Sequence, residues 1–228
     1  MIEVAKAIAC MYTSIVVAQA TEITFNGCNN TTNEYLDFIQ GSGFNTIAKI
    51  EIKKEAMNLN KEITLKIPAA FKDKYGMLTR TFIEEKAFKD LQLKSLRLKI
   101  KFIEGNDKYK YVQIPQNCSE MFAGSDSITE IDLRGVDSSC VTNAWRMFWG
   151  CSGLESIIFG TFNTANIKSM EAMFMGCSEL KNLDLTNFNT ENVETMQSMF
   201  NFCLSLEQLD LCNFDTKKVT NMSYMFRG

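Results

Sequence analysis

The second half of the chain repeats one apolar pattern at a fixed spacing. The dipeptide Met-Phe occurs five times, and each methionine lies 26 positions after the one before. Such a period is typical of solenoids, in which each repeat stacks on its neighbours to bury an apolar face that it cannot bury alone. We therefore predict a solenoid over residues 111–228, with about four to five turns and the dipeptides in its core. The dipeptides are Met121-Phe122, Met147-Phe148, Met173-Phe174, Met199-Phe200 and Met225-Phe226.

Another stretch of each turn has the pattern of a strand. Residues 180–185, for example, read Leu-x-x-Leu-x-Leu, so that Leu183 and Leu185 are two positions apart. Side chains two positions apart point to the same side of a strand. We predict one short parallel strand per turn, and these strands would join into a continuous sheet.

The stretch around each Met-Phe pair has the spacing of a short helix. Val193, Met196 and Met199 are three positions apart, which would place them on one helix face. Asn189 and Thr190 precede them and offer side-chain oxygens for the unpaired N–H groups of a helix start. The prediction is an α/β solenoid in which each turn contains a strand and a capped helix. Glycines that would end these helices in a left-handed conformation are Gly150, Gly176 and Gly228.

The first half of the chain reads as a separate α+β domain over residues 21–110. Alternating apolar and polar residues predict strands at 22–25, 48–52, 62–67 and 96–102, and we expect short helices at 31–40 and 79–91. Residues 1–20 contain an apolar run followed by Ala18-Gln19-Ala20. This segment fits either a signal peptide or a docked N-terminal helix.

Composition and charge narrow the possible functions. The chain has no histidine, which removes histidine-based catalysis and histidine metal ligands, and no pair of carboxylates has the spacing of an acid–base site. We expect no enzymatic activity, no cofactor and no metal. Residues 44–110 carry 16 Lys and Arg against 9 Asp and Glu, while residues 111–228 carry 7 against 14. The lysines of the basic segment alternate with apolar residues, so we expect solvated strand faces rather than a nucleic-acid site.

Three of the eight cysteines share one position of the repeat. Cys151, Cys177 and Cys203 are 26 residues apart, which predicts a ladder of buried thiols in the solenoid core. The sequence contains no C-x-x-C pair that would indicate zinc or a redox dithiol. We expect reduced, structural cysteines.

The full repeat resembles a known family. Residues 183–200 read LDLTNFNTENVETMQSMF and residues 209–226 read LDLCNFDTKKVTNMSYMF. This pattern is similar to the BspA-like leucine-rich repeats that are abundant in mycoplasma surface lipoproteins, and it covers residues 112–228 only. The resemblance implies a leucine-rich-repeat-like solenoid, common in bacterial surface proteins that bind host or matrix partners without enzymatic activity. The first turn departs from the pattern at Ser125, Val136 and Ala144, which suggests a capping turn.

Two sets of residues are candidates for an interaction surface. Trp145 and Trp149 are the only tryptophans, and with Met175 one turn further on they would form an aromatic patch, either exposed or packed beneath the N-terminal domain. Residues between the core leucines would face outward on the strand side, where the aspartates would either hydrogen-bond within their loops or bind a cation or basic ligand. The strand-side candidates are Glu130, Asp132, Asn182, Asp184, Gln208 and Asp210.

Together these features favour a protein-interaction or adhesion module on a bacterial cell or particle surface. The alternative is a structural subunit of a larger assembly, such as a virion, appendage or filament, in which the open solenoid end is the subunit contact. The expected partner is a protein from the host, the matrix or the assembly, and self-association at the C-terminal edge is a further expectation.

Overall fold

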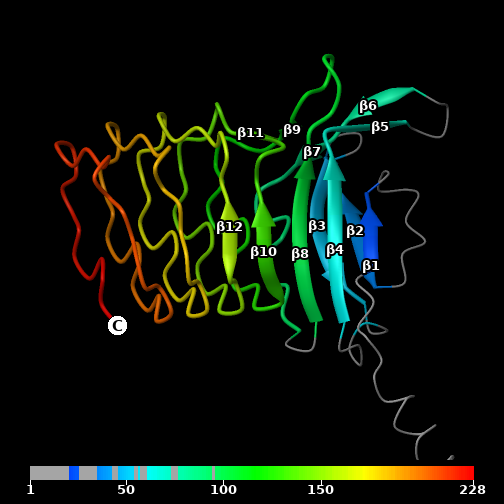
Figure 1. The fold of residues 1–228 in the computed structure, drawn as a ribbon. Coiled ribbons are helices and arrows are strands. Elements are labelled where there is room, and N and C mark those ends of the chain that lie inside the picture. The colour runs from blue at the N-terminus through cyan, green and yellow to red at the C-terminus, as the bar shows by residue number, and fades with distance from the viewer. Residues whose placement is uncertain are drawn as a thin grey trace, which may run out of the picture.

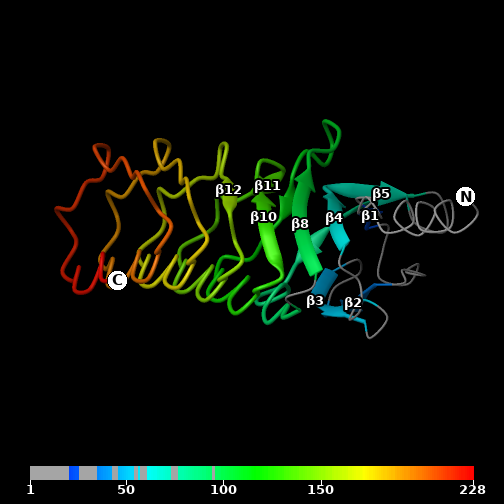
Figure 2. The ribbon, with the colours of Figure 1, turned by 60° about the horizontal axis from the view of Figure 1, so that its bottom comes forward.

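The computed structural model describes residues 21–25, 35–42, 46–53, 56, 61–72, 77–93 and 96–228. The described chain winds into coils that stack along one axis, with strands at one end and a ladder of turns at the other (Figures 1 and 2). The predicted signal peptide or docked helix at residues 1–20 lies outside the described residues.

A parallel sheet runs along one side of the stack. Its strand order is β1-β4-β8-β10-β12, and every neighbouring pair in it is parallel. The four strands predicted in the first half are present as β1, Thr46–Ile52 (β3), β4 and β8. After β12 the side continues as single bridges that join Ser156 to Asn182 and Asn182 to Gln208. The strands span Thr21–Thr24 (β1), Lys61–Pro68 (β4), Leu96–Ile103 (β8), Ile128–Asp132 (β10) and Ser156–Ile158 (β12).

A second sheet forms another side of the stack. Its order is β11-β9-β7-β3-β2, in which only the β2–β3 pair is antiparallel. Both sheets cross residue 110, because β8 pairs with β10 and β7 pairs with β9. A separate antiparallel pair joins Ala70–Lys72 (β5) to Leu78–Arg80 (β6). The strands of the second sheet span Leu36–Gln40 (β2), Thr46–Ile52 (β3), Phe82–Ile83 (β7), Val112–Gln113 (β9) and Val136–Asp137 (β11).

The predicted fold class is wrong, because the described residues form no helix and consist of strands, bridges and turns. The helix expected at 31–40 is occupied by strand β2 over its described part, and that expected at 79–91 contains β6, β7 and a turn. The helix expected in every solenoid turn is absent as well. The described residues therefore form neither an α+β domain nor a solenoid with one helix per repeat.

Successive β-turns replace the helix around each Met-Phe pair. One residue in the middle of this stretch has a left-handed backbone in every turn, with φ between 52° and 58°. A left-handed residue cannot continue a right-handed helix, and the N–H groups on alternate residues point instead along the stack. Thus the Phe148 N–H donates to the Met173 carbonyl at 2.9 Å, and the Phe174 N–H donates to the Met199 carbonyl at 2.9 Å. The left-handed residues are Glu120, Arg146, Ala172, Ser198 and Tyr224.

The residues that were predicted to cap helices instead form hydrogen bonds within and between these turns. The Asn189 side chain accepts from the Glu191 N–H at 2.9 Å and so closes a turn within its own coil. The hydroxyl of Thr190 is buried, where it donates to the Asp215 carbonyl at 3.0 Å and accepts from the Asp215 N–H at 2.8 Å. Gly150 and Gly176 have the predicted left-handed backbone, but they lie among the stacked turns and not at the ends of helices.

Stacked phenylalanine rings form the centre of the core. Ring centroids of neighbouring turns are 5.3 Å apart for Phe122 and Phe148 and 5.5 Å apart for Phe148 and Phe174. The rings of the last two pairs are nearly parallel in the same way. The methionines of the repeated dipeptides are buried beside this column, with Met225 of the last turn 7% exposed. One core cluster includes the five methionines and the rings from Phe122 to Phe200 together with buried residues of the first half.

The column begins one turn earlier than the sequence repeat. Phe88 stacks on Phe122 with centroids 5.0 Å apart, and Lys86 has the left-handed backbone of the later turns. Ala87 takes the place of the methionine. In this turn eight residues, 104–111, separate β8 from β9. In the next turn only three residues separate β10 from β11. The longer loop projects beyond the stack in Figure 1, and its additional residues interrupt the 26-residue spacing in the sequence.

Candidate functional site

Trp145 and Trp149 lie on the turn ladder and hold an arginine between them. The Arg146 guanidinium carbon is 4.5 Å from the Trp145 ring centroid and 5.2 Å from that of Trp149. All three side chains belong to half-buried residues. Met175 is half-buried in the next turn, where its carbonyl accepts from the Gly150 N–H at 2.8 Å. We call Trp145, Arg146, Trp149 and Met175 the tryptophan patch.

The local backbone explains the stacking in the tryptophan patch. Arg146 is the left-handed residue of its turn, with φ of 54°, and a tryptophan lies one position before it and another three positions after it. The Trp145 indole N–H donates to a Glu171 carboxylate oxygen at 3.3 Å, which fixes one ring. Arginine over the face of tryptophan is a favourable cation–π geometry.

Arg146 forms no ion pair within the described part of the chain, and its buried Nε has no hydrogen-bond partner there. By contrast, Glu120 in the preceding turn is bound by Lys86 at 3.1 Å and Lys89 at 3.0 Å. The hydrogen bond from Lys89, together with Lys86, lowers the pKa of the Glu120 carboxyl. The tryptophan patch therefore offers two aromatic surfaces and a cation to an incoming group.

Sequence reasoning missed Arg146 as a member of this patch. The signal was present, because Trp145 and Trp149 flank it closely in the sequence. In the expected helix Arg146 would lie beside Trp149, three positions on, but would not face Trp145, and only the left-handed turn brings all three together.

The strand-side candidates do not come together into one site. Glu130 lies among the lysines of β8, with Lys99 and Lys101 each at 3.7 Å. Asp132 is buried and paired with Arg134, whose Nη2 lies 2.6 Å from its Oδ2. The Asp132 pKa is lowered because hydrogen bonds and charge from Arg134 outweigh the desolvation of the buried carboxyl, which acts in the opposite direction.

The later aspartates close their own loops, as one of the two alternatives predicted. Asp184 accepts from the Thr186 hydroxyl at 2.6 Å and from the Thr186 N–H at 3.0 Å. Asp210 accepts from the Cys212 N–H at 2.9 Å. These hydrogen bonds lower the pKa of both carboxyls. Asn182 and Gln208 are exposed and bridge the backbone of neighbouring turns.

The repeated cysteines bind the backbone of the preceding turn. The Cys177 thiol donates to the Phe148 carbonyl at 3.1 Å, and the Cys151 and Cys203 thiols do the same to Phe122 and Phe174. Burial raises the pKa of the Cys151 thiol to about 12 and that of the Cys203 thiol to about 11. In the described part of the chain no group of three cysteine or acidic side chains could hold a metal, and no helix could span a bilayer.

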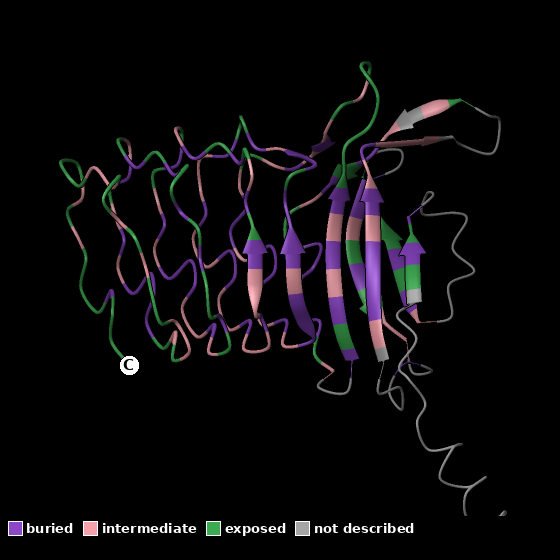
Figure 3. Cartoon of the chain, viewed as in Figure 1, coloured by how far each residue is buried: buried purple, intermediate pink, exposed green. Residues whose placement is uncertain are grey.

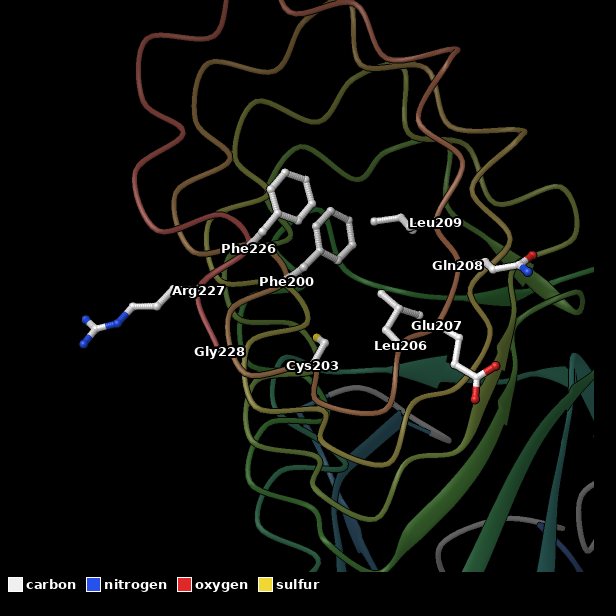
Figure 4. Close-up of a pocket in the computed structure, with 9 residues that line it drawn as sticks. All are labelled: Phe200, Cys203, Leu206, Glu207, Gln208, Leu209, Phe226, Arg227 and Gly228. Atoms are coloured by element: carbon white, nitrogen blue, oxygen red, sulfur yellow. The ribbon is translucent and has the colours of Figure 1, made fainter.

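The last turn leaves a hollow at the end of the stack. Its volume is about 260 Å³, and Figure 4 shows Phe200, Phe226, Leu206 and Leu209 pointing into it while Arg227 points away. Figure 3 shows that exposure increases toward this end of the solenoid. Phe226 is 62% exposed, whereas Phe174 in the same position of its turn is fully buried.

Comparisons with known proteins agree with the repetitive nature of this half. Residues 116–228, just under half of the chain, match the family described as "Mycoplasma protein of unknown function, DUF285". The matched residues therefore resemble a mycoplasma-associated repeat family. Searches of curated proteins and of solved structures gave no match.

Proposed function

We propose that this protein is a non-catalytic protein-interaction or adhesion module, displayed on a bacterial cell or particle surface. The observation that carries the proposal is the tryptophan patch, in which Arg146 lies between the Trp145 and Trp149 rings. Tryptophan and arginine are the residues that most often dominate binding energy in protein interfaces. The similarity of the repeat to BspA-like surface proteins supports the same function.

The geometry of the patch indicates the chemistry of the partner. The two rings are partly accessible and would bury apolar surface, while the Arg146 guanidinium would pair with a carboxylate. A protein segment with an acidic residue beside an apolar one fits this arrangement. Because the rings already hold Arg146 in place, little side-chain freedom would be lost on binding.

Binding of the intact chain to immobilised host-surface and matrix proteins tests the proposal. We expect Trp145→Ala/Trp149→Ala to bind its protein ligand at least about 30-fold more weakly, because truncating a hot-spot residue costs about 2 kcal/mol or more. Ile158→Ala removes another exposed apolar side chain, 38% exposed on the strand side, and should bind like the wild type. Equal binding by the double variant, or equal loss in the control, would contradict the proposal.

A further inference from the structure

A second hollow lies where strands of the parallel sheet begin. Its volume is about 370 Å³, within the range of roughly 300–1,000 Å³ that is common for small-molecule sites. Residues around the start of β8 and β10, and residues that lead into β12 and the following turn, line it. Three carboxylates and one guanidinium belong to this lining, so its charge is negative. We call it the acidic hollow, and its charged residues are Arg97, Asp126, Glu155 and Glu179.

Small residues of the repeat leave this space open. Asp126, Ser152 and Ser178 occupy one position of three successive turns, so two small side chains follow the aspartate. The Ser178 hydroxyl donates to the Ser152 carbonyl at 3.2 Å, which ties this side chain to the backbone. Gly153 follows Ser152, and a Cβ there would lie 2.2 Å from the Asp126 carbonyl oxygen. Glycine therefore lets the backbone of this turn pass close to Asp126.

A bulge in β10 sets Thr129 apart from the ladder of the sheet. The register between β8 and β10 shifts between Ile128 and Glu130, so the intervening Thr129 has no partner residue in β8. Bulges redirect side chains and are frequent beside functional sites. Thr129 lines the acidic hollow and is 5% exposed, and its Oγ1 has no hydrogen-bond partner among the described residues. A buried hydroxyl in this state destabilises the fold unless a ligand completes it.

Asp126 supplies a second oxygen without a partner. Its Oδ1 is buried and forms no hydrogen bond within the described part of the chain. Glu155, by contrast, is paired with Arg97, whose Nη2 lies 2.9 Å from the Glu155 Oε1. The Arg97 Nε also lies 4.0 Å from a Glu62 carboxylate oxygen, so two other carboxylates share this guanidinium. The acidic hollow thus contains one carboxylate oxygen and one hydroxyl oxygen that a ligand could satisfy.

These two oxygens favour a cationic hydrogen-bond donor. An ammonium group has three N–H donors and no acceptor, so it matches a carboxylate and a hydroxyl that both lack a donor. A calcium ion would need several oxygen ligands around one point, and only one of the two unpartnered oxygens is charged. The three carboxylates of the lining disfavour an anion.

We propose that the acidic hollow binds a protonated primary amine, with the ammonium group donating to the Asp126 Oδ1 and the Thr129 Oγ1. The Glu179 carboxylate of the same lining adds attraction for the charge. The ammonium belongs to a free alkyl amine or to a lysine side chain of a bound protein. This site goes beyond the proposed function, because none of its residues belongs to the tryptophan patch.

An NMR titration of the amide signals of the intact chain tests the site. The probes are cadaverine and N-acetyl-lysine methylamide, at constant ionic strength so that screening does not change. We expect saturable shifts at the amides of Thr129, Gly153 and Glu155. Tighter binding of cadaverine identifies a free amine as the ligand, and tighter binding of the lysine compound identifies a lysine of a partner. Tetramethylammonium, which has the charge but no N–H donor, should leave these signals unchanged.

Two variants assign the binding to the two oxygens. Asp126→Asn keeps the shape and removes the charge, so it should bind the amine at least about tenfold more weakly. Thr129→Val should bind about threefold more weakly or worse, because one hydrogen bond is lost. Its urea midpoint should be no lower than that of the wild type, since the substitution removes a buried hydroxyl without a partner. The control is Asp107→Asn, which removes the same charge from the exposed loop at 104–111 and should bind like the wild type.

The contradicting results are equally specific. No saturable shifts with either amine, equal shifts with tetramethylammonium, or equal binding by Asp126→Asn would overturn the proposal. A lower urea midpoint for Thr129→Val would show that the hydroxyl is already satisfied, and would overturn it as well. Calcium chloride that shifts the same amides at lower concentration than the amines would identify a metal site instead. Trp145→Ala/Trp149→Ala should bind the amines normally, so failure of the proposed function leaves this result unchanged.

Discussion

At the scale of the residue, one side chain in each turn donates a hydrogen bond to the phenylalanine carbonyl of the preceding turn. Cys151 and Cys177 donate to phenylalanine carbonyls, and Ser125 fills the same position in the first turn, where its hydroxyl donates to the Phe88 carbonyl at 2.6 Å. The sequence predicted the buried thiols from their spacing. It could not predict their acceptors, because these depend on which backbone groups the neighbouring turn leaves free.

The buried thiols predict a loss of stability at high pH. Burial raises the pKa of Cys151 from its ordinary value of 9.0 to about 12, and the pKa of Cys177 is also well above 9.0. The folded state therefore holds these protons more tightly than the unfolded state. This contribution is fully present below pH 9 and is lost as the pH rises toward 12, by up to about 1.4 kcal/mol per pH unit for each thiol.

Urea unfolding at pH 8 and pH 10.5 measures this contribution. The matched variant is Cys151→Ser/Cys177→Ser, because Ser125 shows that a hydroxyl fits the position and serine does not ionise in this range. We expect the midpoint of the wild type to fall more between the two pH values than that of the variant. Equal falls would show that these thiols do not titrate differently on folding.

At the scale of the element, the repeat satisfies its apolar spacing without a helix. Met170 and Met173 are three positions apart and both buried, and the Met173 N–H donates to the Met170 carbonyl at 3.2 Å. Successive turns with such bonds bury apolar residues at almost the same period as a helix, so the spacing fits either structure. A helix of two turns is marginal alone. Stacking of the coils favours the turns over a helix, because alternate N–H groups donate to carbonyls in the next coil. These bonds between coils cannot be inferred from the sequence of one repeat.

Ser198→Gly distinguishes the two structures directly. Ser198 has φ of 54°, a backbone conformation that costs a residue with a side chain about 1–2 kcal/mol and glycine almost nothing. We expect the variant to be more stable by about 1 kcal/mol in urea unfolding, whereas glycine inside a helix would cost about 0.5–1 kcal/mol. The control is Ser205→Gly, at a position without a left-handed backbone, which should lose stability. A loss at Ser198 equal to that at Ser205 would contradict the turn ladder.

At the scale of the whole molecule, both sheets and the phenylalanine column run through the position where the sequence suggests a domain boundary. The change from a basic to an acidic composition near residue 110 is real in the sequence, but β8 and β10 pair across it. The register of the solenoid and its core residues could be predicted because five turns repeat them without insertion. The earlier turn at Phe88 could not, since alanine replaces methionine and the loop at 104–111 changes the spacing.

The tryptophan patch could be predicted in part for a related reason. Trp145 and Trp149 stand out because other turns have different residues in their positions, and Met175 follows from the repeat. The contact of Arg146 with both rings could not be predicted, because it depends on the left-handed backbone at Arg146, whereas a helix would have brought it to Trp149 alone. Only the hydrogen bonds within their loops distinguish the strand-side aspartates from residues of a binding site, and the sequence alone does not show these bonds.

Residue-resolved amide hydrogen exchange tests the central claim, that the chain is a stack of turns bonded from each coil to the next. The Phe148, Phe174 and Phe200 N–H groups each donate to the following turn at 2.9 Å, whereas the Phe226 N–H has no acceptor among the described residues. We expect the Phe148 and Phe174 amides to exchange orders of magnitude more slowly than that of Phe226, which should exchange at nearly the rate of an unstructured peptide. A helix would instead bond the Phe226 N–H to the Met222 carbonyl within the last turn. Protection of Phe226 equal to that of Phe174 would therefore contradict the account.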